Sequence, residues 1–395
     1  MRKNVKFNFI ELVSFIILAC FSIGLFNLSG LFISFLILLS IVFFIRSRNV
    51  IDYRCYLLLA FSVFFFLNHS LFWGVLVEDI IIYLLAPWSC FLLAKCWVIY
   101  SNSRRCFEFI ILVLIVGFFL HGMLNFYRYV QISGGMDVVQ NSPYRITYDF
   151  WRKEIIAVTG CSLYYVPLMS FSLGYLFFGN GIIKKIVSTC FICLGMWVNI
   201  VYANRTAVFL IFILLLLSVY LKLSDTRSAV KTSFILIVVV FAILLVWNLN
   251  LFDIKTTVMN LNVMQRIEST DEGRVDSWIR FLKSSWWKHP FGGDLAGEKH
   301  AHNMWLDIMR TGGFLPFLFS GLFAISSLEI LYNACKIFKT EGRIYLLLCL
   351  GIYISCSVEP ILQSNPYYFL ILLMIFGAID GKLNKIDYNF IKNVL

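Results

Sequence analysis

Long apolar runs separated by short polar turns cover most of the chain. Each run approaches the roughly 20 apolar residues that a helix needs to cross a bilayer. About twelve such runs can be drawn, at residues 9–27, 29–45, 56–75, 79–100, 106–127, 155–178, 183–203, 205–222, 231–251, 304–334, 343–358 and 364–380. The pattern predicts an all-α integral membrane protein with about 12 transmembrane helices, forming a single polytopic domain over residues 1–395.

One run carries a signal for a break. Residues 304–334 include Gly312, Gly313 and Pro316, which predict a short helix before the glycine pair and a membrane helix after it. Composition agrees with the membrane assignment, because 60% of the residues are hydrophobic and only 14% are charged, against roughly 25% charged in a soluble domain. A water-soluble globular protein and a disordered chain are both excluded.

The basic residues divide by side of the membrane. With a cytoplasmic N-terminus, 20 of the 33 lysines and arginines fall in inner segments, and only Arg205 falls in a short outer turn. This bias predicts that both termini are cytoplasmic. The other 12 lie in two larger periplasmic loops, 128–154 and 252–310. The net charge of +11 therefore indicates an anionic partner on the outer face and not nucleic acid. Lys95, near the inner end of its span, is expected to snorkel to the interface.

Three of the five histidines lie in the second loop, at His289, His300 and His302. A histidine there can accept a proton from a sugar hydroxyl at neutral pH, although a hydrogen-bonded interfacial histidine explains the same pattern. A zinc site is disfavoured, since no cysteine and no i,i+4 histidine pair accompanies them. His69 and His121 lie toward the outer ends of apolar spans, where packing or interfacial roles are the usual ones.

Arg205 stands between two apolar runs without a nearby acidic residue in the sequence NRTAVFLIF. A guanidinium at such an edge is costly unless it is solvated or paired. Snorkelling to lipid headgroups is one explanation, and binding of phosphate or pyrophosphate oxygens by the planar fork is the other. No P-loop or Walker-type lysine occurs, so ATP-driven transport is not expected.

Four short motifs follow one another in a distinctive order: NRTA at 204–207, GR at 273–274, HxHN at 300–303 and the glycine pair at 312–313. Their order, sidedness and spacing resemble the O-antigen ligase and Wzy-type O-antigen polymerase superfamily over nearly the whole chain. The resemblance implies a glycosyltransferase that uses an undecaprenyl-diphosphate-linked glycan at the periplasmic face of a bacterial inner membrane. Asn204 departs from the pattern, because ligases often have Ser or Thr there, and the first loop is short.

The resemblance also implies roles for individual residues. Arg205 and Arg274 would neutralise the departing diphosphate, and His302 would deprotonate the acceptor hydroxyl in an inverting transfer. The resemblance also implies that further residues bind the substrate: Arg145, Arg152, Arg280, His300 and Asn303. No metal, nucleotide or other cofactor is implied, because the lipid diphosphate is already an activated leaving group.

Three functions stay open at the level of sequence. The HNMWLD form of the third motif favours a polymerase that joins lipid-linked O-antigen repeat units, with a chain-length-regulating co-polymerase as a candidate partner. A ligase that moves the glycan to a lipid A core acceptor is the first alternative, and it would use the same donor. A lipid-linked-sugar flippase or transporter is the second, although charged residues in such proteins lie near the membrane midplane.

Overall fold

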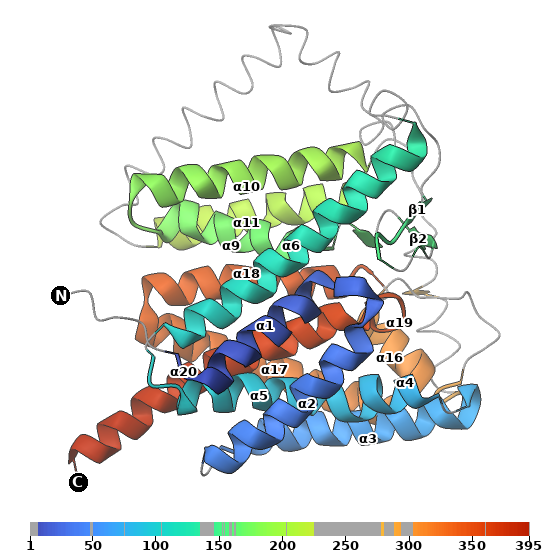
Figure 1. Ribbon diagram of the computed structural model, residues 1–395, viewed down its shortest axis with the longest axis horizontal. Helices are drawn as coiled ribbons and strands as arrows, with labels where there is room; N and C mark the ends of the chain where they lie inside the picture. Colours follow the sequence, from blue (N-terminus) through green and yellow to red (C-terminus); the bar gives the residue numbers. More distant parts are fainter. Residues whose placement is uncertain are drawn as a thin grey trace, which may run out of the picture. The chain divides into compact units, whose positions relative to one another are not determined.

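The computed structural model describes residues 7–47, 50–74, 76–103, 105–134, 146–151, 153, 155–157, 160–161, 163–202, 204–224, 278–279, 288–293, 303–359 and 361–394 (Figure 1). The chain divides into two compact units. Unit 1 comprises Met1–His121, Glu272–Lys339 and Cys356–Leu395, and unit 2 comprises Gly122–Asp271 and Thr340–Ser355.

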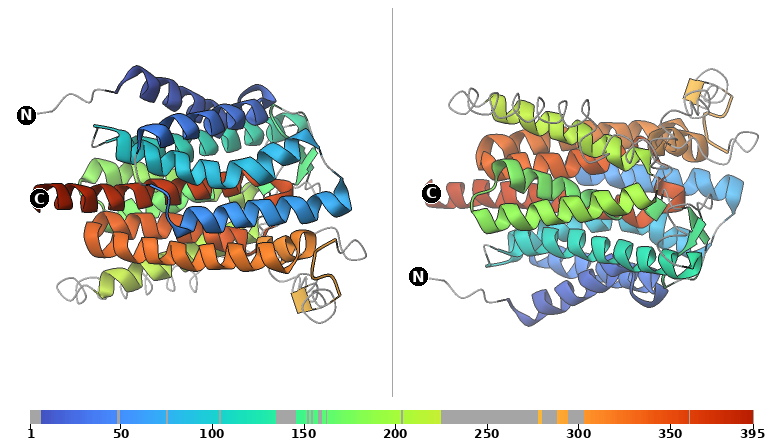
Figure 2. Two further views of the ribbon diagram at one scale, coloured as in Figure 1. Left: turned by 90° about the horizontal axis from the view of Figure 1, so that it is seen from below. Right: turned by 90° about the horizontal axis from the view of Figure 1, so that it is seen from above.

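Unit 1 is built from helices of the two ends of the chain. Its elements are α1 (Phe9–Ile23), η1 (Leu25–Asn27), α2 (Ser29–Arg46), α3 (Tyr53–Trp73), α4 (Val77–Asp79), η2 (Ile80–Leu85), α5 (Ala86–Tyr100), α16 (Met304–Gly312), α17 (Phe314–Phe338), α19 (Ile361–Ser364) and α20 (Pro366–Val394). Figure 2 shows the long helices α2, α3, α5, α17 and α20 running along one common direction. Helix α6 (Cys106–Ser133) begins in this unit and ends in unit 2.

Unit 2 contains helices α9 (Val166–Phe178), α10 (Ile182–Val201), α11 (Arg205–Leu223) and α18 (Thr340–Cys356). It also contains two short antiparallel strands, β1 (Ile146–Tyr148) and β2 (Ile155–Ala157), in which Thr147 lies opposite Ile156. The predicted span at 155–178 is therefore wrong at its start. Its first residues form a strand, and the helix begins at Val166, with Pro167 at a position where a missing N–H costs nothing.

Seven helices of the described part of the chain are long and apolar enough to cross a membrane. They are α2, α3, the continuous helix Val77–Tyr100, α6, α10, Thr206–Leu223 of α11, and α17. The protein is thus a predominantly helical, multi-pass membrane protein, as the apolar pattern predicts. The count of twelve stays a prediction, and the predicted span at 231–251 lies outside the described residues.

Side-chain caps explain where several of these helices begin. Asn8, Asp52, Asn204 and Asn303 each stand just before a helix, and each accepts a hydrogen bond from a backbone N–H of its first turn. The predicted break is confirmed at Gly313, where φ is +83° and α16 gives way to α17. An L-amino acid with a side chain is strained in that conformation, which accounts for glycine at this junction.

Helices α5 and α20 pack closely against each other in unit 1. A Cβ at Gly377 would collide with the Phe91 carbonyl oxygen, and a Cβ at Gly381 would lie 2.6 Å from the Lys95 carbonyl oxygen. These glycines form a GxxxG motif, GAIDG, which lets two helix backbones approach closely inside a membrane. Asp380 lies within the motif, so the same close approach brings its carboxylate to α5.

Candidate functional site

Asn303, the last residue of the HxHN motif, holds the start of α16. Its Oδ1 accepts hydrogen bonds from the N–H groups of Trp305 (3.0 Å) and Leu306 (3.3 Å). Its Nδ2 donates to the Ser357 carbonyl oxygen at 2.8 Å, and Trp305 Nε1 lies 3.2 Å from Ser357 Oγ. Both ends of the amide are therefore used within the protein, and Asn303 anchors the motif. Its substrate-binding role stays a prediction.

Helix α16 carries a buried ion pair. Asp307 is fully buried, Arg310 is 7% exposed, and Arg310 Nε lies 3.2 Å from Asp307 Oδ1. The Thr311 hydroxyl donates to the Asp307 carbonyl oxygen at 2.6 Å. Arg310 is the last residue of the predicted loop 252–310, whose basic residues are expected to face an anionic partner. The structure corrects this, because Arg310 is turned into the protein and neutralised there.

The turn from Lys288 to Gly293 is anchored on the junction between α16 and α17. Phe314 N–H donates to the Pro290 carbonyl oxygen at 2.8 Å, and a Cβ at Gly313 would lie 2.5 Å from that oxygen. Gly292, with φ of +88°, packs against the Thr311 carbonyl group. The glycines on both sides are needed because two backbones meet here without room for side chains. His289 is half-buried in this turn.

Both flanks of the histidine motif are thus fastened to unit 1, at Gly293 before it and at Asn303 after it. The segment between them, 294–302, includes His300 and His302 and lies outside the described residues. The same holds for the predicted site residues Arg145, Arg152, Arg274 and Arg280.

Arg205 is the first residue of α11, in unit 2. Asn204 precedes it, and its side chain accepts a hydrogen bond from Ala207 N–H at 3.2 Å. Asn204 N–H donates to the Asn199 carbonyl oxygen at 2.9 Å, which ties the end of α10 to the start of α11. The Arg205 side chain lies outside the described part of the structure. Its backbone stands where the partial positive charge of a helix N-terminus favours anions.

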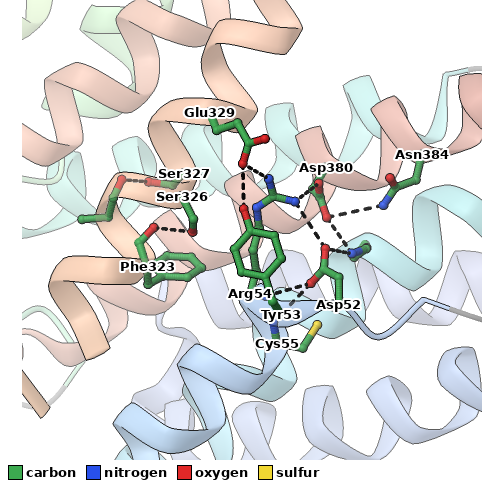
Figure 3. A network of polar contacts seen from close by, with 12 residues as sticks. Asp52, Tyr53, Arg54, Cys55, Phe323, Ser326, Ser327, Glu329, Asp380 and Asn384 are labelled. Carbon is green, nitrogen blue, oxygen red and sulfur yellow. Dashed lines mark hydrogen bonds and ion pairs between the residues drawn. The ribbon is translucent and has the colours of Figure 1, made fainter. Parts of the chain in front are cut away.

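A second polar centre, which was not predicted, lies at the predicted inner end of unit 1 (Figure 3). Lys95 Nζ lies 2.7 Å from Asp52 Oδ2 and 2.7 Å from Asp380 Oδ2. Arg54 lies 3.4 Å from each of these carboxylates and 2.7 Å from Glu329 Oε2. These five residues, called the inner charge cluster below, connect α3, α5, α17 and α20.

The inner charge cluster corrects the expectation for Lys95. Only 1% of the Lys95 side chain is exposed, so it does not snorkel to the interface. Asp380 is 4% exposed, Arg54 11%, Asp52 26% and Glu329 55%. The two basic groups balance the carboxylates of Asp52 and Asp380, while Glu329 remains half in solvent. A buried arrangement of balanced charges is a structural tie between helices, which breaks when one member is lost.

Asp52 stands just before α3, at the edge of this cluster. Burial raises the pKa of its carboxyl group, but the Lys95 ammonium at 2.7 Å, the Cys55 N–H and the Arg54 guanidinium together outweigh burial. The net result is a pKa below the ordinary value of 3.8. Asp52 is therefore ionised at neutral pH, where it serves both as a helix cap and as a counter-ion.

Comparison with known proteins adds no family to this description. No protein-family model matches the chain, and no curated protein matches its sequence. The class of protein therefore follows from its own sequence and fold: it is a multi-pass, predominantly helical membrane protein.

Proposed function

We propose that the protein is a glycosyltransferase of the bacterial inner membrane that joins undecaprenyl-diphosphate-linked repeat units, as an O-antigen polymerase. The observation that carries the proposal is the ordered set of motifs NRTA, GR, HxHN and GG in polar segments on one predicted side of the membrane. The structure supports a functional reading of two of them through local geometry. Asn204 caps the helix whose first residue is Arg205, and Asn303, the residue next to His302, is anchored to the Ser357 carbonyl oxygen.

In the proposed reaction the bond between the anomeric carbon and the diphosphate breaks as the acceptor oxygen attacks from the opposite face. Arg205 and Arg274 neutralise the charge that develops on the departing diphosphate. His302 takes the proton of the acceptor hydroxyl as the new glycosidic bond forms. The first-loop residues Arg145 and Arg152 assist with diphosphate binding, and the products are a longer lipid-linked glycan and the free lipid diphosphate.

The test uses the purified full chain in lipid nanodiscs with synthetic lipid-linked repeat units. Growth of lipid-linked chains supports the polymerase. Reaction only after addition of lipid A core indicates the ligase instead. We expect Arg205→Ala to slow transfer about 100- to 1,000-fold and His302→Ala about 100- to 10,000-fold.

Matched variants distinguish a loss of catalysis from a loss of folding. Arg205→Lys keeps the charge but loses the bidentate fork, so it should recover only part of the activity. His289→Gln changes a histidine of the same loop in the anchored turn and should retain transfer. If both Arg205→Ala and His302→Ala transfer glycan at the wild-type rate, the enzyme proposal is wrong, and lipid-linked-sugar transport becomes the function to test.

A further inference from the structure

A ladder of aromatic rings runs along one face of α3. Phe61, Phe65, His69 and Trp73 follow one another at intervals of four residues, so their side chains stack along the helix. The ring centroids are 5.6 Å apart for Phe61 and Phe65, 5.9 Å for Phe65 and His69, and 6.1 Å for His69 and Trp73. We call these four residues, with Tyr83, the α3 ladder.

Tyr83 completes the ladder from the neighbouring helix. Its ring lies 5.2 Å from Phe65 and 5.1 Å from His69. Tyr83 belongs to η2, which is a turn of π-helix inside the continuous helix Val77–Tyr100. Such turns are rare and recur at functional sites, because they displace side chains from the ordinary helical register.

The ladder changes from buried to exposed along its length. Phe61 and Phe65 are each 1% exposed, whereas Trp73 at the predicted outer end is 50% exposed. His69 lies between these extremes and is the polar member of the stack. Its Nδ1 is buried and has no hydrogen-bond partner among the described residues. A ligand hydroxyl cannot reach this buried nitrogen, so a ligand contact of the His69 ring goes through Nε2, which is not among the buried atoms without a partner.

The exposed end of the ladder lies beside Gly293, at the end of the anchored turn, and beside the C-terminal end of α16. A Cβ at Gly293 would collide with the Phe72 ring, so the end of the anchored turn rests on α3. Asn68 Nδ2 donates to the Gly312 carbonyl oxygen at 2.5 Å, which fastens α3 to the end of α16. Trp73 and His69 therefore belong to the same small region of unit 1 as Gly293, the last described residue before the histidine motif.

We propose that the exposed end of the α3 ladder is a carbohydrate-binding subsite, with Trp73 as the stacking platform and His69 as the hydrogen-bonding group. A pyranose ring has an apolar face of C–H bonds and an edge of hydroxyl groups. The negative face of an indole attracts the C–H bonds, while an imidazole nitrogen accepts or donates one hydroxyl hydrogen bond. The identification of this sugar as part of the transferred glycan rests on the proposed function.

The binding test uses saturation-transfer difference NMR on the full chain in lipid nanodiscs. The probes are free glucose, galactose, N-acetylglucosamine and N-acetylgalactosamine. At least one should bind, with the strongest transfer to C–H protons of one ring face. Trp73→Leu should weaken its binding about tenfold, His69→Gln should also weaken it, and Trp73→Phe should retain most of it.

Trp197→Leu is the matched control, because Trp197 is 44% exposed on α10 and also contacts an aromatic ring, that of Phe126. It should bind the sugar as the wild type does. The inference is overturned if none of the four sugars binds the wild-type protein, or if Trp73→Leu binds as tightly as wild type. In the latter case Trp73 is an interfacial anchor only.

Failure of this inference can be separated from failure of the proposed function. If lipid-linked repeat units are transferred but Trp73→Leu leaves the KM for them unchanged, the proposed subsite is refuted and the proposed enzymatic function is supported. If sugars bind at Trp73 while Arg205→Ala and His302→Ala have no effect on transfer, the proposed subsite is supported and the proposed catalytic roles of Arg205 and His302 are wrong.

Discussion

Replacing Lys95 with Met tests the inner charge cluster most directly. The substitution removes an ammonium group that lies 2.7 Å from two carboxylates, on a side chain only 1% exposed. Methionine has a similar length and volume, so the cavity contribution is small. Asp380, at 4% exposure, would remain buried with Arg54 at 3.4 Å as its nearest cation. Removal of one partner from a buried ion pair costs about 3 to 5 kcal/mol.

The measurement is the free energy of unfolding in mixed micelles, followed by circular dichroism as the fraction of sodium dodecyl sulfate rises. Lys95→Met should lose about 3 to 5 kcal/mol. The double variant Lys95→Met/Asp380→Asn leaves Asp52 and Arg54 as a balanced pair, so it should recover at least half of that loss.

Lys336→Met is the control, because Lys336 is an exposed lysine in the last turn of α17. It should change stability by no more than about 0.5 kcal/mol. The reasoning is refuted if Lys95→Met stays within about 1 kcal/mol of wild type. It is also refuted if the double variant is no more stable than Lys95→Met alone, since the loss would not then come from an uncompensated charge.

Four further substitutions, one of them a control, test other contacts. Gly377→Ala should destabilise the protein by about 1 to 3 kcal/mol, because its Cβ meets a backbone carbonyl on α5; unchanged resistance to sodium dodecyl sulfate would contradict the close helix approach. Gly313→Ala should lower the free energy of unfolding by at least about 1 to 2 kcal/mol for its positive φ alone. Gly321→Ala, with open space around its Cβ, should be neutral or slightly stabilising. Equal melting temperatures for these two variants would refute this prediction. Because the pKa of Asp52 is depressed in the folded state, its contribution to stability is present above its ordinary value of 3.8 and is lost as the pH falls through the lower folded value. When the free energy of unfolding is measured at falling pH, Asp52→Asn should therefore lose less stability than the wild type. Identical acid curves for the two proteins would rule out the role of Asp52 as a counter-ion.

Local signals in the sequence predict the helices well. The apolar runs match α2, α3 and α10 to within a few residues, and the glycine pair marks the break before α17. Run length and glycine conformation act over one or two helical turns, so neighbouring residues suffice to reveal them. The hairpin of β1 and β2 was missed because β1 lies in the segment predicted as the first loop, 128–154, and the apolar β2 was taken as the start of a membrane span.

The candidate site was predictable only in part. Asn303 has a visible helix-capping signal, since Asn precedes a run of helix-forming residues, and the structure shows that cap. The catalytic roles of Arg205, Arg274 and His302 remain predictions from the resemblance. The burial of Arg310 could have been suspected from Asp307 three residues earlier, where a helix brings the two side chains together.

The sequence by itself determined the class of protein, because long apolar runs have no stable alternative to membrane-spanning helices. Only the tertiary structure decided what the charges inside those helices do. Lys95 is 43 residues from Asp52 and still farther along the chain from Asp380, and no local pattern pairs them. The contact between Lys95 and Asp380 forms because the glycines of GAIDG let α20 approach α5 without intervening side chains. A lysine whose position near the end of a span predicts exposure at the membrane surface is thereby buried between two carboxylates, where its charge holds helices together.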